Sequence, residues 1–135
     1  MTNQPSEFPG ACHCRAITFS VKGPISTAVR CTCSFCSAIG ALWHATNDVG
    51  LRLTSGEEAL QMYQFGSMTA KHYFCRHCGV HPFSRPRLNP EIWVVNLHCV
   101  PVVDLEPSSI SIFDGAHWDE AARALFSLKG MRARR

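Results

Sequence analysis

Eight cysteines in a chain of 135 residues are the feature that most limits how this protein can fold. They fall into four groups: Cys12 and Cys14; Cys31, Cys33 and Cys36; Cys75 and Cys78; and Cys99 alone. The N-terminal residues have neither a basic start nor an apolar run, so we expect no secretory signal. The sequence therefore predicts a cytoplasmic protein, in which grouped thiols are typically metal ligands rather than disulfide halves.

The two cysteine pairs together supply the four ligands of one closed metal site. Cys75 and Cys78 are three positions apart in "FCRHCG", and Gly79 provides the backbone freedom that a tight turn around an ion needs. Cys12 and Cys14 are two positions apart, so an extended chain points both side chains to one face. We expect these four cysteines to hold a structural zinc, which closes a long loop between the two pairs.

The triplet in "RCTCSFC" has three thiols, one fewer than a closed zinc site requires. Three protein ligands with a free fourth position are typical of a catalytic zinc. Because three thiolates make the ion electron-rich, we expect its fourth ligand to be soft, such as a substrate sulfur. The sequence thus predicts two zinc ions per chain, the second one at Cys31, Cys33 and Cys36.

Other residues could complete the triplet instead. Cys99 would make a second four-cysteine structural site, and His98 or His44 would make a site of three cysteines and one histidine. The alternative for Cys99 is a buried thiol on a strand without a metal, which is common for free cysteine. We prefer that alternative, and it leaves the fourth position of the triplet open.

Charge and hydropathy exclude some classes of partner. The formal net charge of +3 would be cancelled by seven thiolates and two Zn²⁺ ions, so it does not indicate nucleic-acid binding. No stripe of Lys and Arg occurs apart from the tail "LKGMRARR". No apolar run reaches 18 residues, so we expect no membrane-spanning helix.

Hydrophobic periodicity predicts a mainly β fold in one domain that spans residues 1–135. Short alternating runs separated by Gly and Pro are typical of strands, and they occur in "RAITFSVKG", "STAVRCTC", "GALWHAT", "GLRLTSG", "ALQMYQFG", "TAKHYFC" and "EIWVVNLHCV". Helical spacing occurs in "HWDEAARALFSL", where Trp118, Ala122 and Leu125 share one face. We expect this helix to begin near Asp114 or Gly115 and to end at Gly130.

The segments "GACHCRAITF", "CTCSFCSAIGA", "FCRHCGVHPFSRP", "VVNLHCV" and "IFDGAHW" follow one another in the order and spacing of a known family. From about residue 10 to residue 118, the chain resembles the glutathione-dependent formaldehyde-activating enzymes, or S-(hydroxymethyl)glutathione synthases, whose wider family includes centromere protein V-like members. The seven-cysteine pattern is specific, whereas a single Cys-x-x-Cys pair would be weak evidence.

The resemblance implies a β-tent, a fold of small antiparallel sheets organised around zinc, with a short C-terminal helix. It also implies a structural zinc on the two pairs and a reactive zinc on the triplet. Such an enzyme is a carbon–sulfur lyase that joins a small-molecule thiol, glutathione or an analogue, to an aldehyde, formaldehyde in the family. This chain is shorter than the synthases of the family, so the thiol that it binds is an open question.

Two arginines in "HPFSRPRLNP" are candidates for substrate binding. Arg85 and Arg87 could hold the carboxylates of an anionic thiol such as glutathione, or they could be solvated residues of a proline-stiffened surface loop. The alternative function for the whole chain is a non-catalytic module in which two structural zincs support a protein interaction. A nucleic-acid-binding zinc ribbon is disfavoured by the Cys-x-Cys spacing and the absence of a basic face.

Overall fold

A computed structural model describes residues 6–128 of the chain, and the fold within them is mainly β. The strands in chain order are β1 (Glu7–Ala11), β2 (Thr18–Lys22), β3 (Ala28–Cys31), β4 (Trp43–Thr46), β5 (Leu51–Ser55), β6 (Leu60–Tyr63), β7 (Lys71–Cys75), β8 (Phe83–Arg85), β9 (Trp93–Asn96) and β10 (Ile110–Phe113). The α-helices are α1 (Ser34–Ile39) and α2 (Trp118–Leu128), and the short 3₁₀ turns are η1 (Glu57–Ala59), η2 (Leu97–Cys99), η3 (Pro107–Ser109) and η4 (Gly115–His117). Within these residues no helix has the length and apolar character that a membrane crossing requires.

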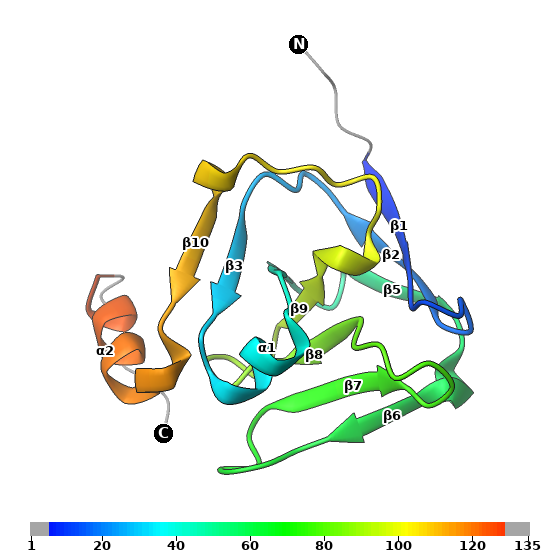
Figure 1. Cartoon of the computed structure of the whole chain (residues 1–135). Helices are drawn as coiled ribbons and strands as arrows, with labels where there is room; N and C mark the ends of the chain where they lie inside the picture. Colours follow the sequence, from blue (N-terminus) through cyan, green and yellow to red (C-terminus); the bar gives the residue numbers. More distant parts are fainter. Residues whose placement is uncertain (1–5, 129–135) are drawn as a thin grey trace.

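The strands form two sheets, in the orders β1-β2-β5 and β10-β3-β4-β9-β8-β7-β6. Figure 1 shows the smaller sheet on one side, the β10–β3 pair on the opposite side and the β7–β6 hairpin below them. Strand β3 pairs with β4 through a single residue pair, Val29 with Trp43, so the larger sheet is almost divided at that point. The prediction of a mainly β fold built from small sheets is confirmed.

One strand pair departs from the antiparallel prediction. Strand β10 runs parallel to β3, from Ile110 opposite Ala28 to Phe113 opposite Cys31. The chain passes through β4 to β9 before it returns, which gives the long connection that a parallel pair needs. This pairing places the segment after β10 next to the cysteine triplet, since Thr32 donates its backbone N–H to the carbonyl of Phe113 at 3.0 Å.

The main core lies between the two sheets and explains the alternating patterns. In β2, Phe19 and Val21 are buried and Ser20 between them is half-buried. Phe19 meets the ring of Phe83 edge-on at 5.6 Å, which joins the smaller sheet to the larger one. The core also contains Cys12 and Cys75, so two members of the four-cysteine cluster belong to the same packed interior.

Helix α1 was not predicted, because its six residues show no apolar periodicity. Its ends are nevertheless capped: the sulfur of Cys33 accepts a hydrogen bond from the backbone N–H of Cys36 at 3.3 Å, and Gly40 adopts a φ of +66° just after the helix. The spacing of a capping cysteine and a following glycine was the available signal. The triplet therefore begins at the last residue of β3 and continues into the first turn of α1.

Two further predictions change in detail. The run "EIWVVNLHCV" is a strand only to Asn96, whose side chain accepts a hydrogen bond from the N–H of His98 and begins turn η2. Cys99 therefore lies in a 3₁₀ turn, not on a strand as expected. Helix α2 follows η4 near the predicted start, whereas its predicted end at Gly130 and the basic tail lie outside the described residues.

Candidate metal centres and the adjoining cavity

The four paired cysteines come together from the turn after β1 and the turn after β7. Sγ of Cys14 lies 3.7 Å from Sγ of Cys12 and 3.6 Å from Sγ of Cys75, and all four sulfurs lie within 4.8 Å of one another. A tetrahedral zinc with bonds of about 2.3 Å places its sulfur ligands about 3.8 Å apart. The cluster therefore has the dimensions of a zinc site.

Backbone hydrogen bonds support this cluster. The N–H of Ile17 donates to Sγ of Cys12 at 3.3 Å, and the N–H of His77 donates to Sγ of Cys75 at 3.4 Å. Gly79, at a φ of +77°, donates its N–H to the carbonyl of Cys75 and closes the turn as its place after Cys78 predicted. Donors aimed at sulfur stabilise the thiolate form that a metal ligand needs.

The triplet brings the sulfurs of Cys31, Cys33 and Cys36 within 4.8 Å of one another at the turn from β3 into α1. Hydrogen bonds from Cys31 and Cys36 lower the pKa of Cys33, and the same contacts raise the pKa of Cys36. The cluster by itself therefore favours one thiolate over three, because like charges this close repel. A bound cation would remove that penalty, and three sulfurs suit zinc.

The alternative ligands of the triplet lie elsewhere. Cys99 packs in the main core near Cys12 and Cys78, where burial raises the pKa of its thiol to about 11. His98 is exposed, and His44 faces a different cavity beside Lys22. Among residues 6–128, no other histidine, cysteine or carboxylate joins the three sulfurs within that 4.8 Å.

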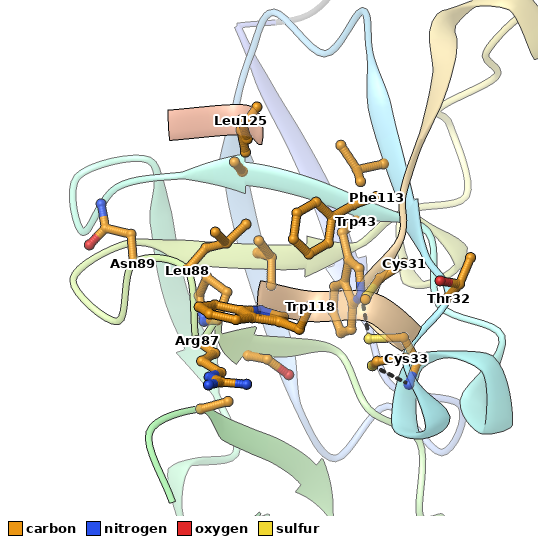
Figure 2. A pocket seen from close by; sticks show the side chains of 18 of the residues that line it. Cys31, Thr32, Cys33, Trp43, Arg87, Leu88, Asn89, Phe113, Trp118 and Leu125 are labelled. Carbon is orange, nitrogen blue, oxygen red and sulfur yellow. Dashed lines mark hydrogen bonds between the residues drawn. The ribbon is translucent and has the colours of Figure 1, made fainter. Parts of the chain in front are cut away.

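Trp43 lies beside the triplet. Its indole Nε1–H donates to Sγ of Cys36 at 3.3 Å, and the ring is buried. Figure 2 shows Trp43 beside Cys31 and Cys33, with the N–H bond drawn. Such a donor fixes the orientation of a ligand sulfur and tunes the metal.

A contact from the "FDGA" segment was missed by sequence reasoning. Thr32 Oγ1 donates to Oδ1 of Asp114 at 2.7 Å, and the backbone N–H of Ala116 donates to Thr32 Oγ1 at 3.2 Å. These bonds hold Gly115 against the triplet so closely that a Cβ atom there would overlap Sγ of Cys31. The glycine in "FDGAH" was the only signal, and its partner is more than 80 positions away in sequence.

A cavity of about 1040 Å³ opens beside the triplet. All three cysteines line it, together with residues from β3, β4, β7, β8, β9, β10 and α2. In Figure 2, Cys31 and Cys33 lie on one side of the cavity, Leu88 and Leu125 lie on the other, and Trp118 lies between them. The helical face that the sequence assigned to α2 therefore contributes Trp118 and Leu125 to the cavity wall.

His72 is a further lining residue that sequence reasoning did not select. Its side chain is buried, its Nδ1 lies 3.2 Å from Oγ of Ser84, and its ring stacks on Phe35 at 3.9 Å. Burial lowers the pKa of His72, which favours the neutral ring. A buried histidine that lines the same cavity as the three cysteines can exchange a proton with a ligand there.

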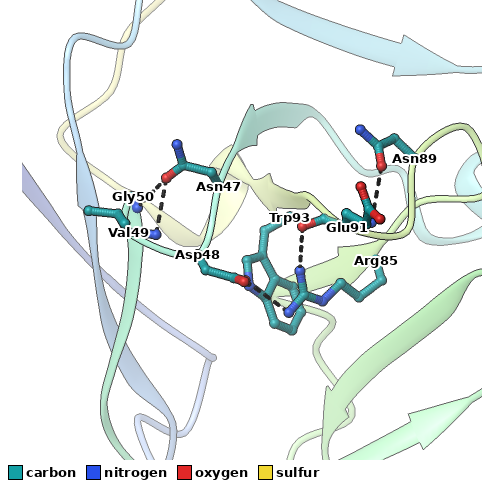
Figure 3. A network of polar contacts seen from close by, with 8 residues as sticks. All are labelled: Asn47, Asp48, Val49, Gly50, Arg85, Asn89, Glu91 and Trp93. Atoms are coloured by element: carbon teal, nitrogen blue, oxygen red, sulfur yellow. Dashed lines mark hydrogen bonds and ion pairs between the residues drawn. The ribbon is translucent and has the colours of Figure 1, made fainter.

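The two candidate arginines have different surroundings. Arg87 lines the cavity, with its guanidinium 3.6 Å from the ring centroid of Trp118 and a longer contact of 3.9 Å to Asp119. Figure 3 shows Arg85 in a separate network, where it pairs with Asp48 at 2.9 Å and donates to the carbonyl of Glu91 at 3.0 Å. Its guanidinium also covers the ring of Trp93 at 3.7 Å. A role for Arg85 in substrate binding stays a prediction.

Comparison with known proteins identifies a matching family and a related solved structure. The family model described as "Glutathione-dependent formaldehyde-activating enzyme" matches residues 7–114, which include all seven clustered cysteines and the segment up to Asp114. A crystal structure of a Rhodobacter sphaeroides protein is 38% identical, with a TM-score of 0.68, and the match covers 77% of this chain and 98% of that one.

Proposed function

The chain belongs to the family of glutathione-dependent formaldehyde-activating enzymes, and from this premise we propose that it is a zinc-dependent carbon–sulfur lyase. It forms and cleaves the adduct of a thiol and an aldehyde, such as S-hydroxymethylglutathione, in the cavity beside Cys31, Cys33 and Cys36. One observation carries the proposal: these three sulfurs line a cavity, whereas the other four clustered cysteines do not line it.

Each cysteine cluster has a distinct role in this proposal. Cys12, Cys14, Cys75 and Cys78 hold a structural zinc, because their four sulfurs complete a tetrahedral site. Cys31, Cys33 and Cys36 hold the second zinc and leave a position toward the cavity. When bound there, zinc supplies a positive charge that lowers the pKa of a substrate thiol, so that the thiol reacts as a thiolate.

The residues of the cavity supply positioning and proton transfer. Addition of a thiol to an aldehyde forms a carbon–sulfur bond, and one proton moves from sulfur to the former carbonyl oxygen. His72 is suited to this transfer, because Ser84 engages its Nδ1 and leaves Nε2 for the substrate. Arg87 offers its guanidinium to a substrate carboxylate at the cavity wall.

The test combines a metal count with a reaction assay on the zinc-loaded full chain. We expect about two zinc ions per chain, and faster exchange between free formaldehyde and its glutathione adduct, followed by NMR, than in buffer alone. Cys33→Ser should lose one zinc and this rate enhancement but keep its fold. Cys99→Ala is the matched control, since Cys99 belongs to neither cluster, and it should keep both.

Two results would contradict the proposal. A count near one zinc in the unaltered chain would remove the two-site assignment. Complete unfolding of Cys33→Ser, equal to that of Cys75→Ser, would indicate two structural zincs and would favour the non-catalytic module instead.

A further inference from the structure

The cavity is much larger than the reacting atoms of the proposed reaction require. Its volume of about 1040 Å³ is at the upper end of the range for sites that enclose drug-sized ligands. Beyond the cysteines, its wall is largely apolar and includes Phe65, Leu88, Ile92, Phe113, Leu125 and Phe126. Formaldehyde adds a single carbon to a thiol, which would leave most of this apolar wall in contact with water.

The lining residues of the cavity carry too few charges to pair with those of glutathione. Glutathione carries two carboxylates and one ammonium group, whereas Arg87 is the only Lys, Arg, Asp or Glu among the described lining residues. Moving unpaired charges from water to an apolar wall is costly. Arg87 can therefore pair with one carboxylate of such a thiol, and the rest of the described wall offers no charged partner for its other groups.

The arrangement of the wall indicates where an apolar group would lie. In Figure 2 Cys31 and Cys33 occupy one side, the ring of Trp118 lies in the middle and Leu88 and Leu125 lie on the far side. A group attached to the carbon that bonds the substrate sulfur would extend from the triplet along Trp118 toward these leucines. Aromatic and aliphatic surfaces of this kind favour alkyl or aryl ligands.

We propose that the substrate of this site is the adduct of a glutathione-like thiol with a large apolar aldehyde, a medium-length alkyl or an aromatic one. The inference rests on the proposed function and specifies its substrate class. The reaction balances without a further reactant: the sulfur–carbon bond forms, the carbonyl becomes a hydroxyl, and the thiol proton ends on that oxygen. Cleavage reverses each change and returns the free aldehyde.

The direct test measures binding of S-alkylglutathiones, stable analogues of the adduct, to the zinc-loaded full chain by isothermal titration calorimetry. From S-methyl through S-butyl to S-octyl, the affinity should rise about threefold to fourfold per methylene until the apolar wall is covered. Leu88→Asn should weaken the S-octyl compound about tenfold or more and leave the S-methyl compound unchanged. Val102→Asn is the control, because Val102 is 59% exposed and lies outside the cavity wall.

Outcomes for the inference and for the proposed function are separable. Equal affinity for S-methyl and S-octyl compounds would overturn the inference even if glutathione–formaldehyde exchange were catalysed. Faster exchange of formaldehyde with an apolar thiol than of octanal with glutathione would also overturn it. The apolar wall would then bind the thiol and not the aldehyde. A chain-length dependence that disappears in Leu88→Asn, with no catalysed exchange for any aldehyde, would support the apolar site and refute the lyase.

Discussion

Replacing Gly115 with alanine tests whether the close contact between the "FDGA" segment and the triplet controls metal binding. A Cβ atom at this position would lie 2.9 Å from Cβ of Cys33 and still closer to Sγ of Cys31, whereas ordinary contacts begin at 3.4 Å. Gly115 is not among the glycines with a positive φ, so alanine adds a clash without backbone strain.

The size of the effect follows from these distances. The backbone of residue 115 or the cysteines must move by more than about 0.5 Å, the difference between 2.9 and 3.4 Å, since the contact with Sγ of Cys31 is shorter still. Zinc sites tolerate ligand distances only within about 0.2 Å of the ideal values. Overpacking of this kind costs about 1–3 kcal/mol, which a domain with its four-cysteine clamp intact survives. Gly115→Ala should therefore fold but bind about one zinc instead of about two.

The assay is a metal count on the purified variant, together with its thermal unfolding and its rate of formaldehyde exchange. Gly66→Ala is the control, because Gly66 has a φ of +59° and open space around its Cα atom. It should lose about 1–2 kcal/mol to backbone strain and keep both zincs. Two zincs and an unchanged exchange rate in Gly115→Ala would refute the view that residue 115 must be small for the triplet to bind metal.

Three other substitutions separate the roles of the remaining residues. Cys75→Ser should abolish cooperative thermal unfolding measured by circular dichroism, because it opens the metal clamp between the two cysteine pairs. Trp43→Phe removes the N–H donor to Cys36 and should weaken zinc at the triplet about tenfold or more in competition with a chelator; unchanged retention would remove that role from Trp43. His72→Gln should slow exchange about 100-fold or more and keep the zinc count and S-octylglutathione affinity, whereas a lost zinc would show a structural role instead.

The fold was predictable where the local sequence pattern reflects which side chains are buried. Strand β2 alternates because one face meets the core, and helix α2 repeats at helical spacing because Ala122 and Phe126 face inward. The parallel pairing of β10 with β3 leaves no local sequence pattern, since it depends on the path of the chain between these two strands. Helix α1 is determined by its caps and by the need for Cys33 and Cys36 to point toward the same site. It therefore shows no hydrophobic periodicity.

The candidate metal ligands were predictable because their spacing is itself the chemical requirement. Two or three thiols within a few positions can reach one ion whatever the rest of the chain does. The groups around the triplet come instead from distant parts of the chain: His72 from β7, Trp118 from α2 and Gly115 from the turn after β10. None of them has a fixed sequence distance from the cysteines, so only the fold identifies them.

Strand β7 connects the four-cysteine cluster to the cavity beside the triplet. His72 near its start lines the cavity, and Cys75 at its end belongs to the four-cysteine cluster. Three residues of strand span about 10 Å, and the intervening pairing with β6 and β8 leaves little freedom to bend. A metal that fixes Cys75 therefore also fixes the register in which His72 meets Ser84. Because a proton donor must be held within hydrogen-bond reach of its substrate, the proposed reaction predicts that the closed cluster supports catalysis through the position of His72 as well as through stability.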